Sequence, residues 1–324
     1  MNSDKLKILK SFKGYFGDYL GLILTLIFLI FIFSLLTKYF FTATTFITIA
    51  NQIPSALLIA TGITFVLIIA EIDLSVGSVF GLCGAVIGAG LTKWGINPIF
   101  SIFGGLITGL LCGLFNGFVS QKWKLPSFIV TLGMLEIARG GAHTVTNSQT
   151  LYVGESLNFV SETSIIGLSL PFFLSFLIVI ISQLVLSRTV FGRYMIAIGT
   201  NEEAVRLSGI NPHPIKLAVF IICGLLVSLA AVIDTARFHS ANPNAGIGFE
   251  LQAIAAAVIG GTSLMGGRGS TIRTFFGVLI IAVLNSGLSA IGLRDEIKRL
   301  ITGAVIIIAV VIDYYRLKIK SGKL

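Results

Sequence analysis

Two carboxylates and two hydroxyls interrupt an apolar stretch of the chain, in the sequence Glu71-Ile-Asp73-Leu-Ser75-Val-Gly77-Ser78. The side chain of Asp73 or Ser75 could accept a hydrogen bond from the first amides of a following helix and so cap it. Gly77 follows closely. We expect an opened backbone here that serves as a gate or as a contact for a partner, with an ordinary tight turn as the alternative.

A second unusual segment, residues 242–269, places an alanine-rich core between glycines. Small residues permit close contact between helices, and glycines at both ends suit a short or broken helix that lines a cavity. Neutral polar substrates need donors and acceptors in such a cavity. Besides Asp73, Ser75 and Gly77, the candidates for a gate or translocation path are Asn51, Gln52, Asn116, Glu250, Gly260, Gly261, Thr262 and Asn285. Hydrogen bonds between helices are the alternative role for the asparagines and Gln52.

Residues 201–210 predict a short amphipathic helix outside the membrane. Asn201 is a suitable N-cap, and Glu202 and Glu203 place acidic charge in the first turn, where it suits the helix dipole. A helix this short is not stable alone, so we expect it to dock onto a partner and transmit motion; resting on the membrane surface is the alternative. Its remaining members are Ala204, Val205, Arg206, Leu207, Ser208, Gly209 and Ile210, with Gly209 and Pro212 ending it.

Motifs for catalysis and for nucleotide or metal binding are absent from the sequence. Residues 261–268 have the glycine spacing of a P-loop but lack its Lys and its Ser/Thr. The three histidines are scattered, and no nucleophile motif occurs. The three cysteines lie in apolar runs without C-x-x-C spacing. We therefore expect no enzyme activity, no cofactor and no metal in this chain.

The composition places the chain in a bilayer. Charged residues make up 11% of the 324 residues and hydrophobic ones 55%, with 36 Gly and a mean hydropathy of +0.97. Soluble domains have about 25% charged residues, so a soluble enzyme, a disordered chain and a disulfide scaffold are excluded. The net charge of +9 could suggest nucleic acid, but the charges lie at chain ends and between apolar runs, which indicates a role in membrane topology and no nucleic-acid partner.

Hydrophobic runs of the length that spans a bilayer, about 20 residues, predict an all-α polytopic bundle of about ten transmembrane helices, some short or broken. The third and eighth runs are the shortest and could be re-entrant. The ten predicted spans are Gly17–Leu36, Phe46–Ala70, Val76–Leu91, Pro98–Val119, Pro126–Ala142, Ser164–Leu186, Pro214–Asp234, Phe249–Leu264, Thr274–Gly292 and Ile297–Asp313.

The lysines and arginines orient these spans. With a cytoplasmic N-terminus, sixteen of the 23 fall on the inside, in agreement with the positive-inside rule. We therefore predict a cytoplasmic N-terminal tail (residues 1–16), one membrane domain (17–313) with a cytoplasmic loop at 188–213, and a basic cytoplasmic C-terminal tail (314–324).

Three blocks of sequence resemble the permease subunits of the ribose/xylose/galactose class of bacterial ABC sugar importers. The first is Gly62–Ser78. The second runs from Phe191-Gly-Arg through Asn201-Glu202 to Arg206-Leu-Ser-Gly-Ile210. The third starts at Ala236-Arg-Phe-His-Ser-Ala-Asn-Pro-Asn-Ala-Gly246 and continues through Gly260-Gly-Thr-Ser-Leu264 to Gly266-Gly267. The resemblance extends over most of the chain and is strongest from Phe191 to Gly292.

The resemblance implies a multi-pass permease of the bacterial inner membrane that moves a monosaccharide such as ribose. It implies three partners: an ATP-binding subunit that contacts the helix at 201–210, an extracytoplasmic sugar-binding protein, and a second permease copy, identical or not. The chain departs from the family pattern at Glu71, where Gly is usual, and at Asp234, Gln252 and Arg273. A permease for a nucleoside or a furanose signal molecule, and a proton-coupled sugar carrier, are the alternatives.

Overall fold

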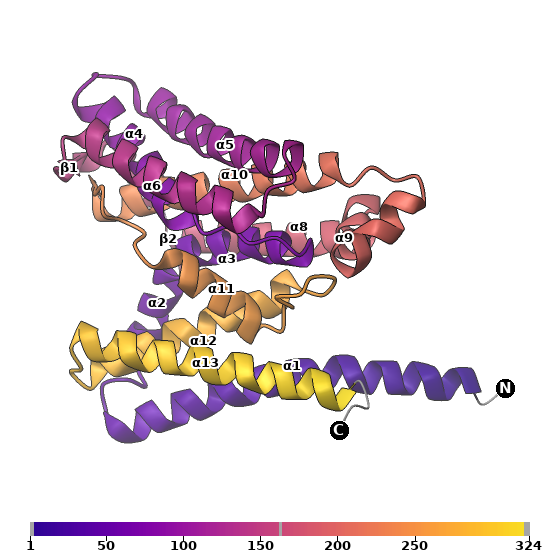
Figure 1. Cartoon of the computed structure of the whole chain (residues 1–324). Coiled ribbons are helices and arrows are strands. Elements are labelled where there is room, and N and C mark those ends of the chain that lie inside the picture. The colour runs from indigo at the N-terminus through magenta and orange to yellow at the C-terminus, as the bar shows by residue number, and fades with distance from the viewer. Residues whose placement is uncertain (1–2, 162–163, 321–324) are drawn as a thin grey trace.

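The computed structural model describes residues 3–161 and 164–320, which form an almost entirely helical bundle (Figure 1). Its helices are α1 (Ser3–Leu36), α2 (Ala43–Gln52), α3 (Pro54–Ile68), α4 (Val76–Thr92), α5 (Pro98–Lys122), α6 (Ser127–Thr146), the short 3₁₀ helix η1 (Gly154–Leu157), α7 (Asn158–Ser161), α8 (Leu170–Arg188), α9 (Val190–Leu207), α10 (His213–Phe238), α11 (Phe249–Ile259), α12 (Thr271–Ala290) and α13 (Asp295–Lys320). Two antiparallel pairs of two-residue strands complete the described chain: β1 (Leu151–Tyr152) with β4 (Ser240–Ala241), and β2 (Ser164–Ile165) with β3 (Leu168–Ser169).

Helix α3 lies at the centre of the bundle. Every residue of α3 except Ala56 is buried, as expected of a helix that is apolar on all sides. Helix α10 packs against both α3 and α5, and α4 packs against α5, α6 and α10. Helices α11 and α12 contact α3 as a second group, and α1 packs along α12 (Figure 1). The core therefore joins two helical layers through α3.

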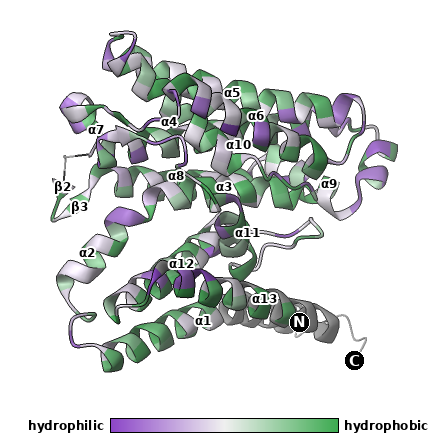
Figure 2. Ribbon diagram, turned by 60° about the vertical axis from the view of Figure 1, so that its left-hand side comes forward, coloured by the Kyte–Doolittle hydropathy of each residue, from purple (hydrophilic) through white to green (hydrophobic). Residues whose placement is uncertain are grey.

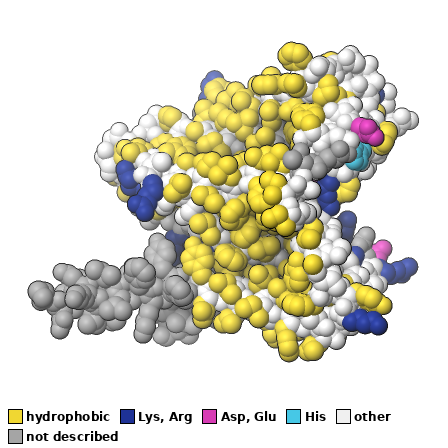
Figure 3. Space-filling model, turned by 180° about the vertical axis from the view of Figure 1, so that it is seen from behind, with side chains coloured by type: hydrophobic (Ala, Val, Ile, Leu, Met, Phe, Trp, Pro, Cys, Tyr) yellow, Lys and Arg dark blue, Asp and Glu magenta, His cyan; other side chains and the backbone are white. Residues whose placement is uncertain are grey.

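Hydrophobic side chains cover the outside of the bundle. Figure 3 shows one face of the molecule with hydrophobic side chains across its middle and Lys and Arg near its edges. Figure 2 shows apolar residues along the helices and many of the hydrophilic ones at helix ends and in loops. Five helices are long and apolar enough to cross a membrane, and the bent pair α2–α3 makes a sixth. The fold is thus that of an all-α membrane protein, although these criteria give five or six spans rather than ten.

The predicted boundaries need correction at several places. The predicted span Phe46–Ala70 is two helices bent by 47°, because Pro54 at the start of α3 has no N–H with which to continue α2. The predicted span Ser164–Leu186 begins too early, because Ile166 and Gly167 have positive φ and turn residues 164–169 into the β2–β3 hairpin.

One other predicted span ends earlier than expected, and the predicted loop and the described parts of the tails are largely helical. The predicted span Phe249–Leu264 ends as a helix at Ile259, because Gly261 adopts a φ of +81° that other residues avoid. The loop at 188–213 is mostly helical, since α9 fills Val190–Leu207 with a kink at Asn201. Residues 3–16 and 314–320, predicted as tails, continue α1 and α13 as helix.

Glycines at every fourth residue bring α5 and α10 into backbone contact. In α5 they are Gly109, Gly113 and Gly117, whereas Gly105, one turn earlier, packs against Ile87 of α4. A Cβ atom at Gly109 would meet the carbonyl oxygen of Gly224 in α10, and one at Gly113 would meet the carbonyl oxygen of Phe220. Helices in lipid associate through such close packing, because lipid leaves little hydrophobic driving force between them.

We predict that Gly113→Ala destabilises the protein by about 1–3 kcal/mol, because the added methyl group forces α10 away from α5. Gly133→Ala is the matched control, since a Cβ at Gly133 in α6 meets nothing within 4 Å. Both changes improve helix propensity by about 1 kcal/mol, so their difference measures the clash. Thermal unfolding of the detergent-purified chain should show a lower melting temperature for Gly113→Ala alone; equal melting temperatures would contradict this packing.

Candidate functional site

Residues 69–75 form a non-helical break between α3 and α4, which we call the α3–α4 break. Asp73 and Ser75 are both buried. One carboxylate oxygen of Asp73 accepts hydrogen bonds from the Ser75 N–H (2.8 Å) and from the Ser75 hydroxyl (2.6 Å), as in an Asx turn. The amide of Asn116 in α5 donates to the same hydroxyl at 2.9 Å. Three predicted site residues thus meet in one cluster.

The capping role that the sequence suggested is only partly present. Ser75 occupies the N-cap position of α4, but its side chain caps no amide of that helix. Two other amides of the break are bound by hydroxyls of α6: Ile72 N–H donates to Ser127 at 3.0 Å, and Leu74 N–H donates to Thr131 at 3.1 Å. Helix α6 therefore holds the break from one side.

The cluster around Asp73 is closed in this conformation. The cavity beside Asp73, Ser75 and Asn116 has a volume of about 10 Å³, which is room for about one water molecule. The Oδ1 atom of Asn116 is buried and has no hydrogen-bond partner among the described residues. The predicted gate residues are thus packed together, and no open passage runs between them here.

A larger cavity of about 180 Å³ lies where α11 and α12 meet the α2–α3 bend. Its polar lining consists of three carboxamide side chains, those of Gln52, Gln252 and Asn285, and Phe249 adds an aromatic ring. Among the described residues, no ionisable one lines it. We call it the amide cavity. Carboxamides both donate and accept hydrogen bonds, so the cavity suits a neutral polar molecule.

Sequence reasoning found only part of this lining. It named Gln52 and Asn285, but it noted Gln252 only as a departure from the family pattern and missed Phe249. A signal was present, because Phe249 and Gln252 are three residues apart and therefore share one face of α11. Asn51 lies elsewhere: its amide donates to the Gly167 carbonyl at 3.0 Å and accepts from Ser169 N–H at 2.8 Å, which ties α2 to the β2–β3 hairpin.

Gly77 and Glu250 join the α3–α4 break to the amide cavity. A Cβ at Gly77 in α4 would collide with the Glu250 carboxylate and with the Gly246 carbonyl, so the first turns of α4 and α11 touch. Arg139 of α6 donates to the carbonyls of Pro243 (2.7 Å) and Ala245 (3.0 Å) and fixes the loop before α11. The start of α4 is therefore packed directly against the helix that carries Phe249 and Gln252.

The last predicted path residues end α11 and do not line the amide cavity. Gly260 is the C-cap of α11 and packs against the Arg273 carbonyl, where a side chain has no room. Gly261 N–H and Thr262 N–H donate to the carbonyls of Val258 (2.7 Å) and Ala257 (2.9 Å). The Thr262 hydroxyl is buried without a partner among the described residues.

The 201–210 segment continues α9 beyond a sharp kink. Asn201 has an extended backbone (φ −162°, ψ 95°), and its side chain accepts from Ala204 N–H at 3.0 Å, as an N-cap does. Gly209, at φ +81°, lies just after the C-cap Ser208, and Val205 turns inward.

The outer surface of the 201–210 segment is mixed in character. Glu203 and Arg206 form an exposed ion pair at 2.7 Å, and Leu207 is 79% exposed. Ala204 and Ser208 are exposed beside them, whereas Ile210 packs against the core.

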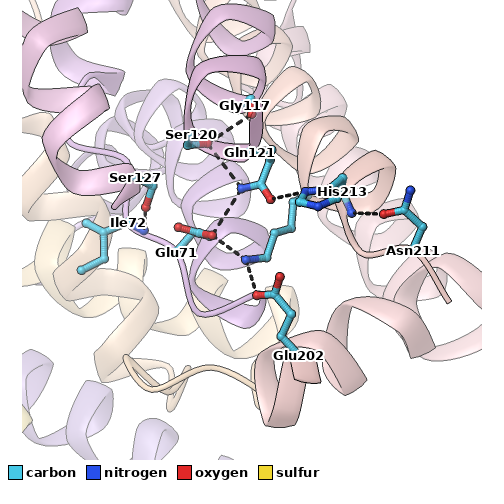
Figure 4. Close-up of polar contacts among 10 residues, drawn as sticks. Glu71, Ile72, Gly117, Ser120, Gln121, Ser127, Glu202, Asn211 and His213 are labelled. Atoms are coloured by element: carbon cyan, nitrogen blue, oxygen red, sulfur yellow. Dashed lines mark hydrogen bonds and ion pairs between the residues drawn. The ribbon is translucent and has the colours of Figure 1, made fainter. Parts of the chain in front are cut away.

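Lys216 connects the 201–210 segment to the α3–α4 break. Its Nζ atom lies 2.7 Å from Glu71 Oε1 and 2.6 Å from Glu202 Oε2 (Figure 4). Gln121 of α5 donates to Glu71 at 3.5 Å, and His213 donates to Gln121 at 3.3 Å. Sequence reasoning used Lys216 only for orientation, although a lysine inside the first turn of an apolar helix signals a buried partner.

The chain is similar in sequence to known permeases over nearly its whole length. The family model described as "branched-chain amino acid transport system / permease component" matches residues 45–310. The chain is 38% identical to the ribose import permease protein RbsC of Escherichia coli K12 over 90% of its length and 92% of that protein. It is 38% identical to RbsC of Bacillus subtilis 168 and 36% identical to the D-allose transport system permease protein AlsC of E. coli K12, each over 92% of both chains.

No solved structure shows a significant match to the chain. The break, the amide cavity and the kinked helix α9 all lie within the matched residues. The family model covers more than half of the chain, and the relatives match at nearly full length. The chain therefore belongs to the permease family described as the branched-chain amino acid transport system / permease component.

Proposed function

We propose that this chain is the membrane permease of an ABC importer that moves a monosaccharide, ribose or a closely related sugar, across the bacterial inner membrane. The observation that carries the proposal is the near full-length similarity to permeases named for ribose and D-allose import. The chain contains no P-loop, so ATP hydrolysis belongs to a separate subunit. It is a transport subunit and not an enzyme.

The amide cavity is part of the proposed translocation path. Sugars carry hydroxyl groups that donate and accept hydrogen bonds, and Gln52, Gln252 and Asn285 offer both functions. The ring of Phe249 gives the apolar face of a sugar a surface to lie on. Asp73, Ser75 and Asn116 act as a gate that is closed in this conformation. The described lining of the amide cavity holds no ionisable residue, which supports transport without coupling to protons at this site.

The 201–210 segment is the proposed contact for the ATP-binding subunit. It lies at the same end of the bundle as the start of α1 and the end of α13 (Figure 1). Basic residues are concentrated at this end, which supports a cytoplasmic orientation. The opposite end, with η1 and the β1–β4 pair, then faces the sugar-binding protein. We further propose that α4, α6, α11 and α13 complete ten membrane segments and that two permease copies form the channel.

We expect proteoliposomes with this chain, its ATP-binding subunit and its binding protein to import radiolabelled ribose or a related monosaccharide only when ATP is supplied. An uncoupler should leave the uptake unchanged, because no proton gradient drives it. Excess unlabelled nucleoside serves as a competitor that tests the alternative substrate class. Uptake that persists without ATP and collapses with the uncoupler would overturn the proposal in favour of a secondary carrier.

If the amide cavity holds the substrate, a cysteine introduced by Gln252→Cys should be protected from thiol reagents when substrate is present. We expect substrate to slow its modification by a small charged thiol reagent, because the sugar covers that position during transport. Leu251→Cys is the matched control: Leu251 is 60% exposed on the neighbouring face of α11 and lies outside the cavity. The native cysteines Cys83, Cys112 and Cys223 are buried, which keeps the background low. Equal labelling of Gln252→Cys with and without substrate would show that the amide cavity is not part of the translocation path.

The 201–210 segment makes a third prediction. Glu203→Lys or Gly209→Val should abolish ATP-driven uptake while membrane insertion and the elution profile of the purified chain stay normal. The first change reverses charge on the exposed surface, and the second strains a backbone that has φ +81°. Glu203→Asp keeps the charge and is expected to transport. Normal uptake by both disruptive variants would refute the contact with the ATP-binding subunit.

A further inference from the structure

Lys216 is one buried cation shared by two carboxylates that lie far apart in the sequence. It is 6% exposed, and its two contacts, to Glu71 and Glu202, are short enough to be charge-assisted hydrogen bonds. Burial of a charge is costly unless the charge is paired. Lys216 therefore holds Glu71 and Glu202 together, and without it two carboxylates would face each other with no cation between them.

A backbone contact reinforces this link just before the kink in α9. Gly267 N–H donates to the carbonyl of Ile68, the last residue of α3, at 2.9 Å. Gly199 packs so closely on this carbonyl that a side chain would collide with it. The part of α9 before the kink is thus packed against the end of α3 at Gly199, and the 201–210 segment beyond the kink is linked to Glu71 of the α3–α4 break by Lys216.

The two contacts of Lys216 differ in how easily they break. The side chain of Glu71 is 14% exposed, whereas that of Glu202 is 43% exposed. Solvent screens the Glu202 contact more strongly, so it is the weaker of the two. If the 201–210 segment moves away, Lys216 keeps Glu71 as its partner and no bare cation is left. If the segment moves without breaking the contact, Lys216 and Glu71 must follow it.

Movement of Glu71 acts directly on the rest of the break. The adjoining residue Ile72 is bound to Ser127, and Asp73 follows with its bonds to Ser75. A shift at Glu71 therefore stretches the hydrogen bonds that hold Asp73, Ser75 and Asn116 together. Among the residues that the structure describes, the one other ion pair, Glu203–Arg206, lies within α9.

We propose that Lys216 is a positioning residue for transport: through Glu202 and Glu71 it transmits displacement of the 201–210 segment to the α3–α4 break. This inference rests on the proposed function, because it takes the ATP-binding subunit as the source of the displacement. It assigns to Lys216 and Glu71 a role that contact with substrate does not explain, since neither residue lines the amide cavity.

The test is the number of sugar molecules imported per ATP hydrolysed in the reconstituted importer. For Lys216→Gln we expect this ratio to fall about tenfold or more while ATP hydrolysis continues, in the range of coupling energies between distant sites. Lys216→Arg retains the cation and should restore coupled transport. If Lys216 had only a structural role, Lys216→Gln would not hydrolyse ATP without importing sugar, and Lys216→Arg would not restore the import.

A second variant covers the case in which Lys216→Gln fails to fold. The combined change Glu71→Gln, Glu202→Gln and Lys216→Met removes all three charges together and leaves no unpaired charge buried. It should fold, as measured by melting temperature, and still be uncoupled. A wild-type ratio in this variant, or in a folded Lys216→Gln, would overturn the inference. Absence of ATP-dependent uptake by the wild-type importer would instead refute the proposed function.

Discussion

Backbone polar groups inside a membrane protein need hydrogen-bond partners from the protein itself. The break between α3 and α4 is not helical, so its amides cannot all find these partners in the regular bonds of a helix. The break follows the most buried helix of the bundle, and several of its amides depend on hydroxyls of α6 and on a carboxylate of the break itself. Ser127, Thr131 and Asp73 supply these partners. The surrounding helices are consequently held in register by hydrogen bonds that a movement of the break must exchange.

Neutral polar side chains and charged side chains gather in two different places in the molecule. Among the described residues, the amide cavity is lined by carboxamides and an aromatic ring without charge, while the buried Lys216 forms two ion pairs, with Glu71 and Glu202. This division suits a permease that handles a neutral sugar in its centre and receives mechanical force at one end. Gly77 in α4, packed against Glu250 in α11, connects the two places through helix contacts.

Sequence periodicity and caps predicted the helices well where a local signal fixes them. Asn201 and Gly209 bound the 201–210 segment as expected, because an N-cap side chain and a left-handed glycine act within a few residues. The bend at Pro54 and the β2–β3 hairpin were missed, because both lie inside apolar runs that a hydropathy window reads as continuous. Lys216 was missed because its partners come from residues distant in sequence, which only the packing of α3, α9 and α10 brings together.

Hydrogen exchange at the amides of Ile72 and Leu74 in the assembled importer tests the central claim most directly, because these amides report whether the break opens. We expect slow exchange at rest, and exchange about tenfold or more faster when the ATP-binding subunit is trapped with nucleotide. In Lys216→Gln the same trapping should leave the exchange slow. Equal exchange at both amides in the resting and trapped wild-type importer would show that the break does not open when nucleotide binds.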